Sequence, residues 1–195
     1  MKPTLNEKRF NPANLEKLDN PERRRTLPPN KLLGLLPIKE NDNILDIGAG
    51  TGYFTIPAAK RTKGTVYALD VEPIMLSVIK DKANEENLDN VVPVEGTIEQ
   101  NPLEDEKVEH IIASFVLHEA EPLSQALKEI YRVLKSSGYC FCLEWEKKPM
   151  EQGPSEHHRI HSSDMEDLLA KVGFQVVKRY NPTDLHYILI AQKSK

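Results

Sequence analysis

Three glycines at alternate positions are the most distinctive chemical feature of the sequence. Gly48, Gly50 and Gly52 stand in a run that reads DIGAGTGY over residues 46–53. Because glycine has no Cβ, such a run lets the backbone turn tightly and approach a ligand closely. A helix that begins directly after the run would present free amides and the positive end of its dipole, which favour a carboxylate or a phosphate. The run therefore predicts a ligand-binding loop.

An acidic residue, Asp70, follows 18 residues after Gly52, at the end of the next apolar run. A carboxylate at this place can accept hydrogen bonds from both hydroxyls of a ribose. The glycine spacing bears on which nucleoside binds. A dinucleotide fingerprint reads G-x-G-x-x-G, whereas here the third glycine comes one residue early and Tyr53 occupies the dinucleotide position. The spacing thus counts against a nicotinamide dinucleotide.

Short apolar strands alternate with helices along most of the chain. We expect strands at residues 43–47, 65–69, 91–94, 108–113 and 139–145. Helices are expected at 53–61, from Pro73, and from Pro122 to about Ser136-Ser137-Gly138, where glycine would adopt a left-handed conformation. A further helix is expected to start at a capping box formed by Ser163 and Glu166 and to end near Val172.

Two closing strands, 174–179 and 185–191, have no helix between them and are expected to pair as an antiparallel hairpin. The alternation before them predicts right-handed crossovers and an α/β fold, a doubly wound, mostly parallel seven-stranded sheet of Rossmann-like type. Ligands of such sheets bind at the carboxyl ends of the strands, near the point where the strand order reverses. The glycine run and Asp70 both fall at such strand ends.

The composition indicates one soluble domain. The chain has 195 residues, a formal net charge of -4 and 39% hydrophobic residues, which suffices for one sizeable core. It contains no apolar run of about 18 residues that could span a membrane and no secretory signal. Two cysteines cannot form a disulfide framework, and zinc-ligand spacing is absent. The mild acidity argues against binding nucleic acid by charge. We therefore expect a cytoplasmic protein without membrane, nucleic-acid or metal partners.

The first 30 residues differ in composition from the rest because prolines and charge clusters punctuate them. We expect residues 1–30 to form an arm with at most one short helix, and residues 31–195 to form the ligand-binding domain. The sequence leaves open whether the arm is mobile or folds over the domain as a lid. It also leaves the oligomeric state open.

Five segments resemble motifs of the class I S-adenosylmethionine-dependent methyltransferases. Their residues are 44–52 (ILDIGAGTG), 67–76 (YALDVEPIML), 95–99 (EGTIE), 113–118 (ASFVLH) and 130–138 (IYRVLKSSG). The last is similar to the family's R-x-L-K-P-G-G turn, with serines in place of Pro and Gly. Within the family, the chain looks most like the small-molecule enzymes related to ubiquinone and menaquinone biosynthesis. The resemblance covers about residues 32–192.

The resemblance implies that the chain binds S-adenosylmethionine and releases S-adenosylhomocysteine. The methionine end would lie over the glycine loop, the ribose would bind Asp70, and Ser114 and Phe115 would lie beside the sulfonium. Thr97 stands where many relatives carry Asp. The full set of implied cofactor contacts is Asp46, Gly48, Gly50, Gly52, Tyr53, Asp70, Val71, Met75, Thr97, Ile98, Ser114 and Phe115.

Methyl transfer requires an aligned acceptor, and it requires a base only if the acceptor must lose a proton. His118 and Glu119, which follow the fourth strand, are the candidate catalytic residues. A histidine pKa near 6.5 suits proton transfer at neutral pH. The alternative is that His118 is a hydrogen-bonded loop residue that only shapes the pocket. Trp145, at the end of the fifth strand, either forms a wall of the acceptor site or belongs to the core.

The leading hypothesis is methyl transfer by in-line displacement to an unidentified small-molecule acceptor. The chain lacks an Asn-Pro-Pro-Tyr-like motif after the fourth strand, which disfavours methylation of adenine or of an amide. One alternative is a nicotinamide-dependent oxidoreductase. Another is a cofactor-binding protein that kept the fold and lost catalysis. The acceptor, and whether oxygen, nitrogen, carbon or sulfur is methylated, stay open.

Overall fold

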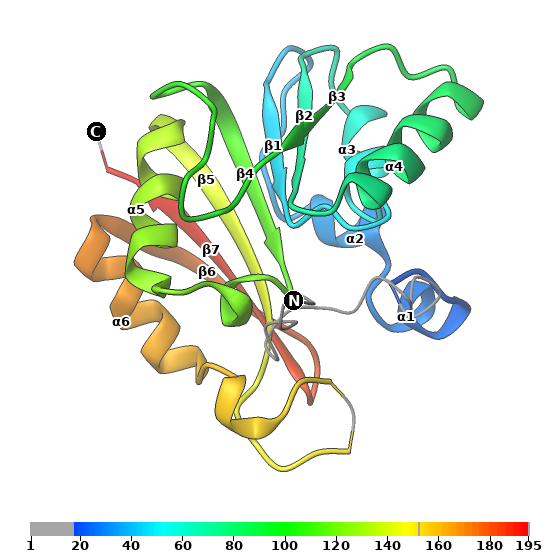
Figure 1. The fold of residues 1–195 in the computed structure, drawn as a ribbon. Helices are drawn as coiled ribbons and strands as arrows, with labels where there is room; N and C mark the ends of the chain where they lie inside the picture. Colours follow the sequence, from blue (N-terminus) through cyan, green and yellow to red (C-terminus); the bar gives the residue numbers. More distant parts are fainter. Residues whose placement is uncertain (1–17, 152, 195) are drawn as a thin grey trace, which may run out of the picture.

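The computed structural model describes residues 18–151 and 153–194, and these residues form a seven-stranded sheet with helices on both faces (Figure 1). The strand order is β3-β2-β1-β4-β5-β7-β6. The fold prediction is confirmed. The strands are β1 (Ile44–Ile47), β2 (Val66–Asp70), β3 (Val91–Glu95), β4 (Val108–Ser114), β5 (Leu134–Trp145), β6 (Phe174–Thr183) and β7 (His186–Lys193). The helices are α1 (Pro21–Thr26), α2 (Pro29–Leu33), α3 (Thr55–Ala59), α4 (Pro73–Glu85), η2 (Leu117–Glu119), α5 (Leu123–Val133), η3 (Glu156–His158) and α6 (Ser162–Val172).

The strand order reverses beside β1, which pairs in parallel with both β2 and β4. The chain runs outward from β1 to β3 and then returns to place β4 on the other side of β1. The carboxyl ends of β1 and β4 therefore diverge into loops on opposite faces, which opens a crevice between them. The strand β7 pairs antiparallel with both of its neighbours, β5 and β6, as the closing hairpin predicts.

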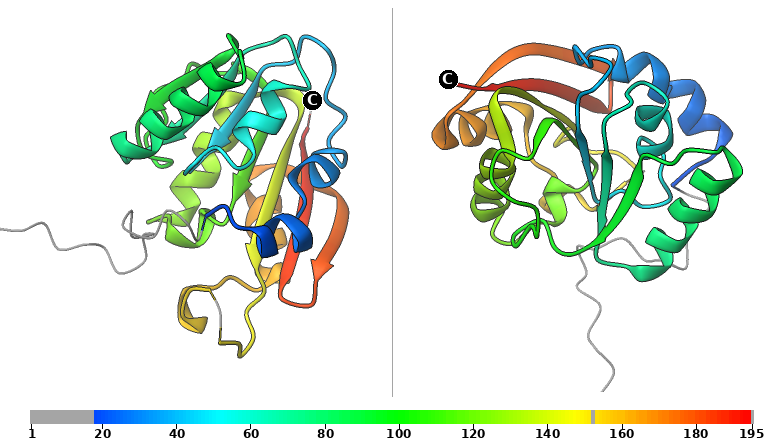
Figure 2. Two further views of the ribbon diagram at one scale, coloured as in Figure 1. Left: turned by 90° about the vertical axis from the view of Figure 1, so that its right-hand side faces the viewer. Right: turned by 90° about the horizontal axis from the view of Figure 1, so that it is seen from above.

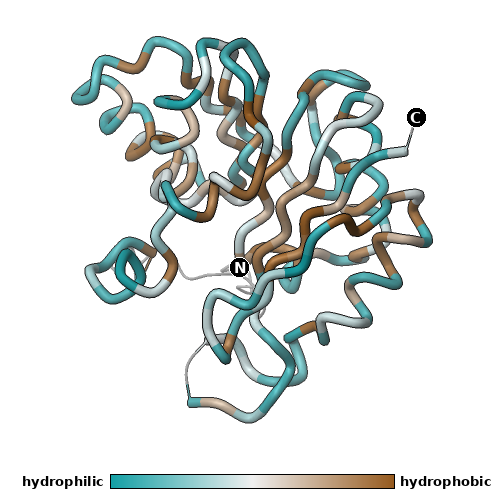
Figure 3. Tube along the Cα trace, turned by 180° about the vertical axis from the view of Figure 1, so that it is seen from behind, coloured by the Kyte–Doolittle hydropathy of each residue, from teal (hydrophilic) through white to brown (hydrophobic). Residues whose placement is uncertain are grey.

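The alternation of side chains along each strand divides the core into two main layers. Leu45, Ile111 and Cys140 pack in a cluster with α5 and α6, whereas Ile44, Ile112 and Phe141 pack in a cluster with α2 and α3. Figure 2 shows the helices on either side of the twisted sheet, and Figure 3 shows that the hydrophobic positions concentrate in its strands. The central strands β1 and β4 are buried on both faces, as expected of a parallel sheet, whereas the edge strands β3 and β6 are partly exposed. Among the described residues, no helix is long and apolar enough to cross a membrane.

The described part of the N-terminal arm contains α1 and the start of α2. Asn20 caps α1 by accepting a hydrogen bond from the Arg23 amide at 2.9 Å. Leu27, Leu32 and Leu33 are buried and join the α2–α3 side of the core. The segment is thus anchored to the sheet at residue 27, just after α1. Residues 1–17 of the expected arm lie outside the described residues.

The expected end of the α5 helix is wrong. The helix stops at Val133, and Leu134 is already extended and begins β5, which is longer than the expected strand at 139–145. Ser137, not Gly138, has the left-handed φ, at 64°. Glycine is required at 138 for another reason: a Cβ there would lie 2.7 Å from the Glu109 carbonyl oxygen of the neighbouring strand.

Two other helix starts also differ from expectation. The helix α3 covers only Thr55–Ala59, because residues 51–54 form turns. The capping box at Ser163 is wrong as well: α6 begins at Ser162, and the side chain of His161 accepts from the Ser163 amide. Glu166 does not cap the helix, and its carboxylate accepts a hydrogen bond from Arg179 of β6.

Candidate functional site

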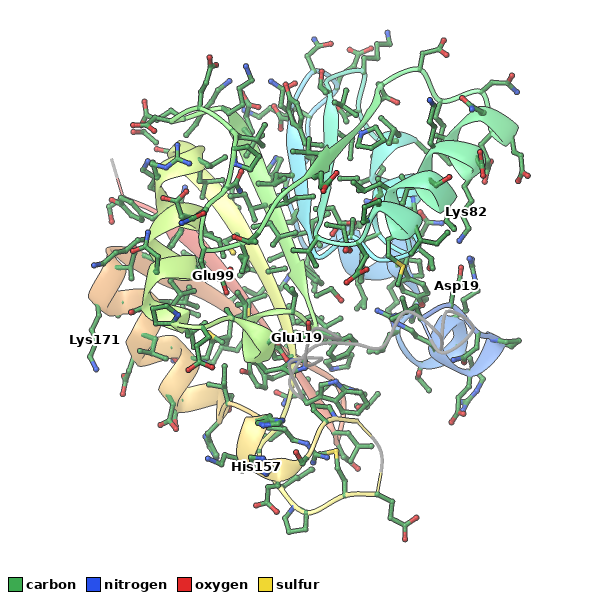
Figure 4. All side chains as sticks on the ribbon, viewed as in Figure 1. Asp19, Lys82, Glu99, Glu119, His157 and Lys171 are labelled. Carbon is green, nitrogen blue, oxygen red and sulfur yellow. The ribbon has the colours of Figure 1, made fainter. Side chains whose placement is uncertain are left out.

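A cavity of about 990 Å³ lies at the carboxyl ends of β1, β2, β4 and β5. The segment 18–27 and the loop after β5 complete its wall. In Figure 4, Glu119 is labelled at this edge of the sheet, between α1 and the loop that carries His157. The cavity therefore occupies the place where the strand order reverses, which is where ligands of doubly wound sheets bind.

The glycine loop forms one side of the cavity. Gly48, Gly50 and Gly52 have φ values of 63°, 53° and 81°, in the left-handed region that glycine adopts without steric cost. A Cβ on Gly48 would lie 2.5 Å from a methyl group of Val116, so a side chain there would not fit. Gly52 differs from the other two: its Cβ would face Ile79 at 3.2 Å, and it packs against α4 instead of lining the cavity.

Asp70 holds the glycine loop and the turn after β2 together. One carboxylate oxygen accepts from the Gly50 amide at 2.8 Å, and the other accepts from the Glu72 amide at 3.0 Å. Each carboxylate oxygen has a second lone pair. Asp70 lines the cavity and can therefore still accept hydrogen bonds from a ligand hydroxyl.

Asp46, the last acid before the glycine loop, is buried at the carboxyl end of β1, with 2% of its surface exposed. Burial raises the pKa of its carboxyl to about 7, against the hydrogen bond that the Thr55 hydroxyl donates at 2.6 Å. The negative charge of Asp70 adds to the rise, and the positive charge of Arg23 opposes it. Asp46 is thus a carboxyl that can change its protonation near neutral pH.

His118 contacts a buried carboxylate. Its Nδ1 lies 2.9 Å from Oε2 of Glu144, a residue of β5 that is 1% exposed. Its Nε2 lies 4.0 Å from Oε1 of Glu119. Burial lowers the pKa of His118, but the charges of Glu144 and Glu119 outweigh burial, and the net pKa is raised. The imidazole lines the cavity.

Aromatic rings form the wall opposite the glycine loop. Phe115 packs on Trp145 with ring centres 5.1 Å apart, and His186 contacts both rings. Burial lowers the pKa of His186 to about 4, so its ring is neutral at physiological pH. The guanidinium of Arg23 lies over the rings of Tyr53 and Phe115, at 4.1 and 5.3 Å from their centres. A planar, uncharged group fits such a wall.

Comparison with known proteins assigns the family. The methyltransferase domain family matches residues 45–142, just over half of the chain. The chain belongs to the methyltransferase domain family. The solved structure of a SAM-dependent methyltransferase from Aquifex aeolicus is 28% identical, with a TM-score of 0.87 over 94% of this chain and 99% of that chain. The class I methyltransferase resemblance and the α/β fold are both confirmed.

Two curated relatives carry more specific names. A demethylmenaquinone methyltransferase from Listeria welshimeri is 31% identical over 112 residues, which cover 56% of this chain and 48% of the relative. A ubiquinone/menaquinone biosynthesis C-methyltransferase from Bartonella quintana is 35% identical over 117 residues, which cover 58% of this chain and 45% of the relative. The methyltransferase domain thus spans about half the length of the curated relatives that it matches.

The predicted site residues of the methyltransferase domain come together around one cavity. With the exception of Gly52, all of them line it. Their roles in binding and catalysis stay predictions. The lining residues among them are Asp46, Gly48, Gly50, Tyr53, Asp70, Val71, Met75, Thr97, Ile98, Ser114, Phe115, His118 and Glu119.

Three further residues of the methyltransferase domain contact this site and were not among the predicted ones. Arg23 belongs to a triple-arginine run that is typical of a solvated helix, and only its packing on Tyr53 distinguishes it. Glu144 and His186 stand at the facing ends of β5 and β7, where the sequence shows no motif. The signal that could have found Glu144 is its position directly after the apolar run of residues 139–143. Among the described residues, no group of three possible metal ligands occurs.

Proposed function

We propose that this chain binds S-adenosylmethionine and transfers its methyl group to a small molecule that carries a planar ring. The single observation that supports this most is Asp70. It lies at the end of β2, lines the cavity and is tied to the glycine loop by a hydrogen bond to Gly50. A carboxylate beside a glycine loop at the edge of one cavity matches a ligand with a ribose and a charged amino-acid end.

The residues around the cavity fit the cofactor chemically. Asp70 would accept from the ribose hydroxyls, while Val71 and Met75 offer apolar contact to the adenine. The hydroxyl of Ser114 is buried at the cavity wall and has no hydrogen-bond partner within the part of the chain that the structure describes. Because buried polar groups are normally paired, this orphan supports a polar ligand at that place.

The other half of the cavity supports binding of the acceptor. When bound, the cofactor supplies a methyl group on a positively charged sulfur, which is a good leaving group. The chain must then hold the acceptor close and aligned, an effect that contributes several kcal/mol, up to about 7–11 in ideal cases. The wall of Phe115, Trp145 and His186 offers stacking to a flat ring, and His118 and Glu119 stay the candidate proton acceptors. The names of the Listeria and Bartonella relatives agree with a quinone-like acceptor.

The first test is calorimetric titration with S-adenosylmethionine, S-adenosylhomocysteine and NADH. We expect micromolar binding of the first two, weakened at least about tenfold in Asp70→Ala, a loss of ~1.4 kcal/mol. Asp81→Ala, a change at an exposed residue of α4, is the control and should bind as the wild type does. Binding of NADH alone, or of none of the three, would overturn the proposal.

Turnover needs a second test, because the fold alone does not prove catalysis. Methyl-labelled cofactor would be incubated with a panel of hydroquinones, catechols and simple phenols, and with aliphatic amines as the contrasting class. We expect label to pass to at least one phenolic compound. Tight binding of S-adenosylhomocysteine with no transfer to any member of the panel would instead favour a non-catalytic cofactor-binding protein.

A further inference from the structure

Glu144 is the most enclosed carboxylate at the site, and its four neighbours are all nitrogens. One oxygen accepts from the amides of Leu117 and His118, at 2.9 and 3.3 Å. The other accepts from the Trp145 amide at 3.2 Å and lies 2.9 Å from His118 Nδ1. Glu144 therefore fastens η2, which carries His118, to the end of β5.

This arrangement fixes the tautomer of His118. Three of the four neighbours of Glu144 are backbone N–H groups, which can only donate. An ionised Glu144 can accept a hydrogen bond from each of the four nitrogens if His118 Nδ1 also carries a hydrogen. A neutral imidazole has only one N–H, so the lone pair must then lie on Nε2. The nitrogen next to Glu119 is thus the one that can accept a proton.

The charged groups around the imidazole favour protonation of its second nitrogen, Nε2. Glu144 faces it from β5, Glu119 from η2 and Arg159 from the loop after η3. The two carboxylates favour the imidazolium, and Arg159 opposes it. A proton taken by Nε2 would be held between two negative groups within 4.0 Å of the ring. The surroundings therefore stabilise the imidazolium that forms when Nε2 accepts a proton.

We propose that Glu144 is a positioning residue that holds His118 in the Nδ1–H tautomer, so that Nε2 serves as the base for an acceptor with an acidic hydroxyl. The inference rests on the proposed function and narrows its substrate class. The acceptor hydroxyl passes its proton to Nε2, and the electron pair left on the acceptor forms the new bond to the methyl carbon. The pair of the broken carbon–sulfur bond stays on sulfur, and the imidazolium later releases its proton through Glu119 to water.

The test measures the tautomer directly, by long-range ¹H–¹⁵N NMR on the histidine rings, with His118→Asn to assign the signals. At a pH high enough for the ring to be neutral, because the pKa of His118 is raised, we expect hydrogen on Nδ1 and none on Nε2 in the wild type. In Glu144→Gln, the oxygen of the new amide would accept the hydrogen bonds from the backbone amides of Leu117 and His118. The reverse orientation is disfavoured because it would place the NH₂ group of the glutamine against these two N–H donors. The NH₂ then faces Nδ1, and the hydrogen is expected to move to Nε2.

Glu146→Gln, two residues further along the chain and paired with the Ser162 amide, is the matched control and should leave the tautomer unchanged. Asp70→Ala should weaken S-adenosylhomocysteine binding at least about tenfold without moving the tautomer. Glu144→Gln should move the tautomer and leave S-adenosylhomocysteine binding unchanged. The proposal on cofactor binding and the proposal on Glu144 can therefore be disproved independently of each other. A wild-type His118 with hydrogen on Nε2, or a tautomer that Glu144→Gln leaves unchanged, would overturn the inference. If Glu144→Gln does not fold, the wild-type spectrum alone decides.

Once a phenolic acceptor is found, the rate supplies a second readout. Removing a general base costs about 10²–10⁴-fold in typical enzymes. We expect Glu144→Gln to lower kcat at least about tenfold with little change in the KM of the cofactor, and this deficit should shrink as the pH rises and the acceptor ionises without help. An equal deficit at every pH would indicate a structural role and contradict the inference.

Discussion

Asp46 illustrates how one residue can link protonation to stability. Its pKa is raised to about 7 in the folded chain, whereas an unfolded aspartate titrates near 3.8. Between these two pH values the folded state keeps the Asp46 proton, whereas the unfolded state releases it. The stabilisation that comes from this proton is therefore complete below about pH 4 and is lost as the pH rises to about 7. Relative to Asp46→Asn, the wild type should lose up to ~1.4 kcal/mol per pH unit in this range. Urea denaturation at pH 5, 6, 7 and 8 measures the difference, and parallel curves would contradict the expectation.

Arg23 is the residue whose role differs most from its appearance in the sequence. It lines the cavity, and its buried Nε has no hydrogen-bond partner among the described residues. We expect it to bind the carboxylate of the cofactor's amino-acid end, and Arg23→Gln to weaken S-adenosylhomocysteine at least about tenfold. Arg25→Gln, on the exposed side of α1, is the matched control. Methylthioadenosine has no carboxylate and should bind Arg23→Gln as it binds wild type. An equal loss for both ligands would assign Arg23 to packing on Tyr53 alone.

At the scale of elements, the first part of β5 has a strained residue and a closely packed residue next to each other. Ser137 has a φ of 64°, which costs a side-chain-bearing residue about 1 kcal/mol, while Gly138 lies against the Glu109 carbonyl. Ser137→Gly should therefore raise the free energy of unfolding by about 0.5–1 kcal/mol. Gly138→Ala should lower it by at least ~1 kcal/mol, because the overlap is with backbone. Chemical denaturation of both variants tests the pair; the same sign for both would contradict this account.

The elements also show which parts of the fold can be predicted from sequence patterns. The strands β1, β2 and β4 were predictable because each is a short and mainly apolar run, and the first two of these runs position Asp46 and Asp70. The start of α6 was not, because both Ser162 and Ser163 can cap a helix and the choice depended on His161 and on the tertiary pairing of Glu166 with Arg179. Local patterns thus located the cofactor side of the site, but not contacts between distant segments.

The same distinction explains what the sequence could not show at the acceptor side. Glu144 and His118 are 26 residues apart, and Trp145 meets His186 only because β7 runs antiparallel to β5 in that particular register. Neither contact has a local signature. Arg23 reaches the cavity only because Leu27 anchors the segment after α1 to the core.

At the scale of the whole molecule, cofactor binding should stabilise the fold, because the cavity is assembled from segments between residue 18 and residue 186. A ligand present at 100 times its dissociation constant adds ~2.7 kcal/mol if it binds only the folded state. For a chain of this length that corresponds to a rise in Tm of roughly 5–11 °C. Scanning calorimetry with S-adenosylhomocysteine should show the shift, and NADH at the same concentration should not. An unchanged Tm at a saturating concentration would show that the segments do not close on the ligand.

The family match ends at Cys142, two residues before Glu144 on the same strand. Asp70 and the glycine loop lie within the matched part, whereas Glu144, Trp145 and His186 follow it. One strand, β5, thus carries both the end of the matched segment and Glu144, and the likeness to the Aquifex aeolicus structure continues beyond it to cover 94% of the chain. Substitutions at Trp145 and His186 leave Asp70 and the glycine loop unchanged, so under the proposed function they would alter the acceptor wall and not the proposed methyl-donor contacts. We therefore expect that exchanging residues 143–195 with those of a relative changes which acceptors are methylated, while binding of S-adenosylhomocysteine is kept.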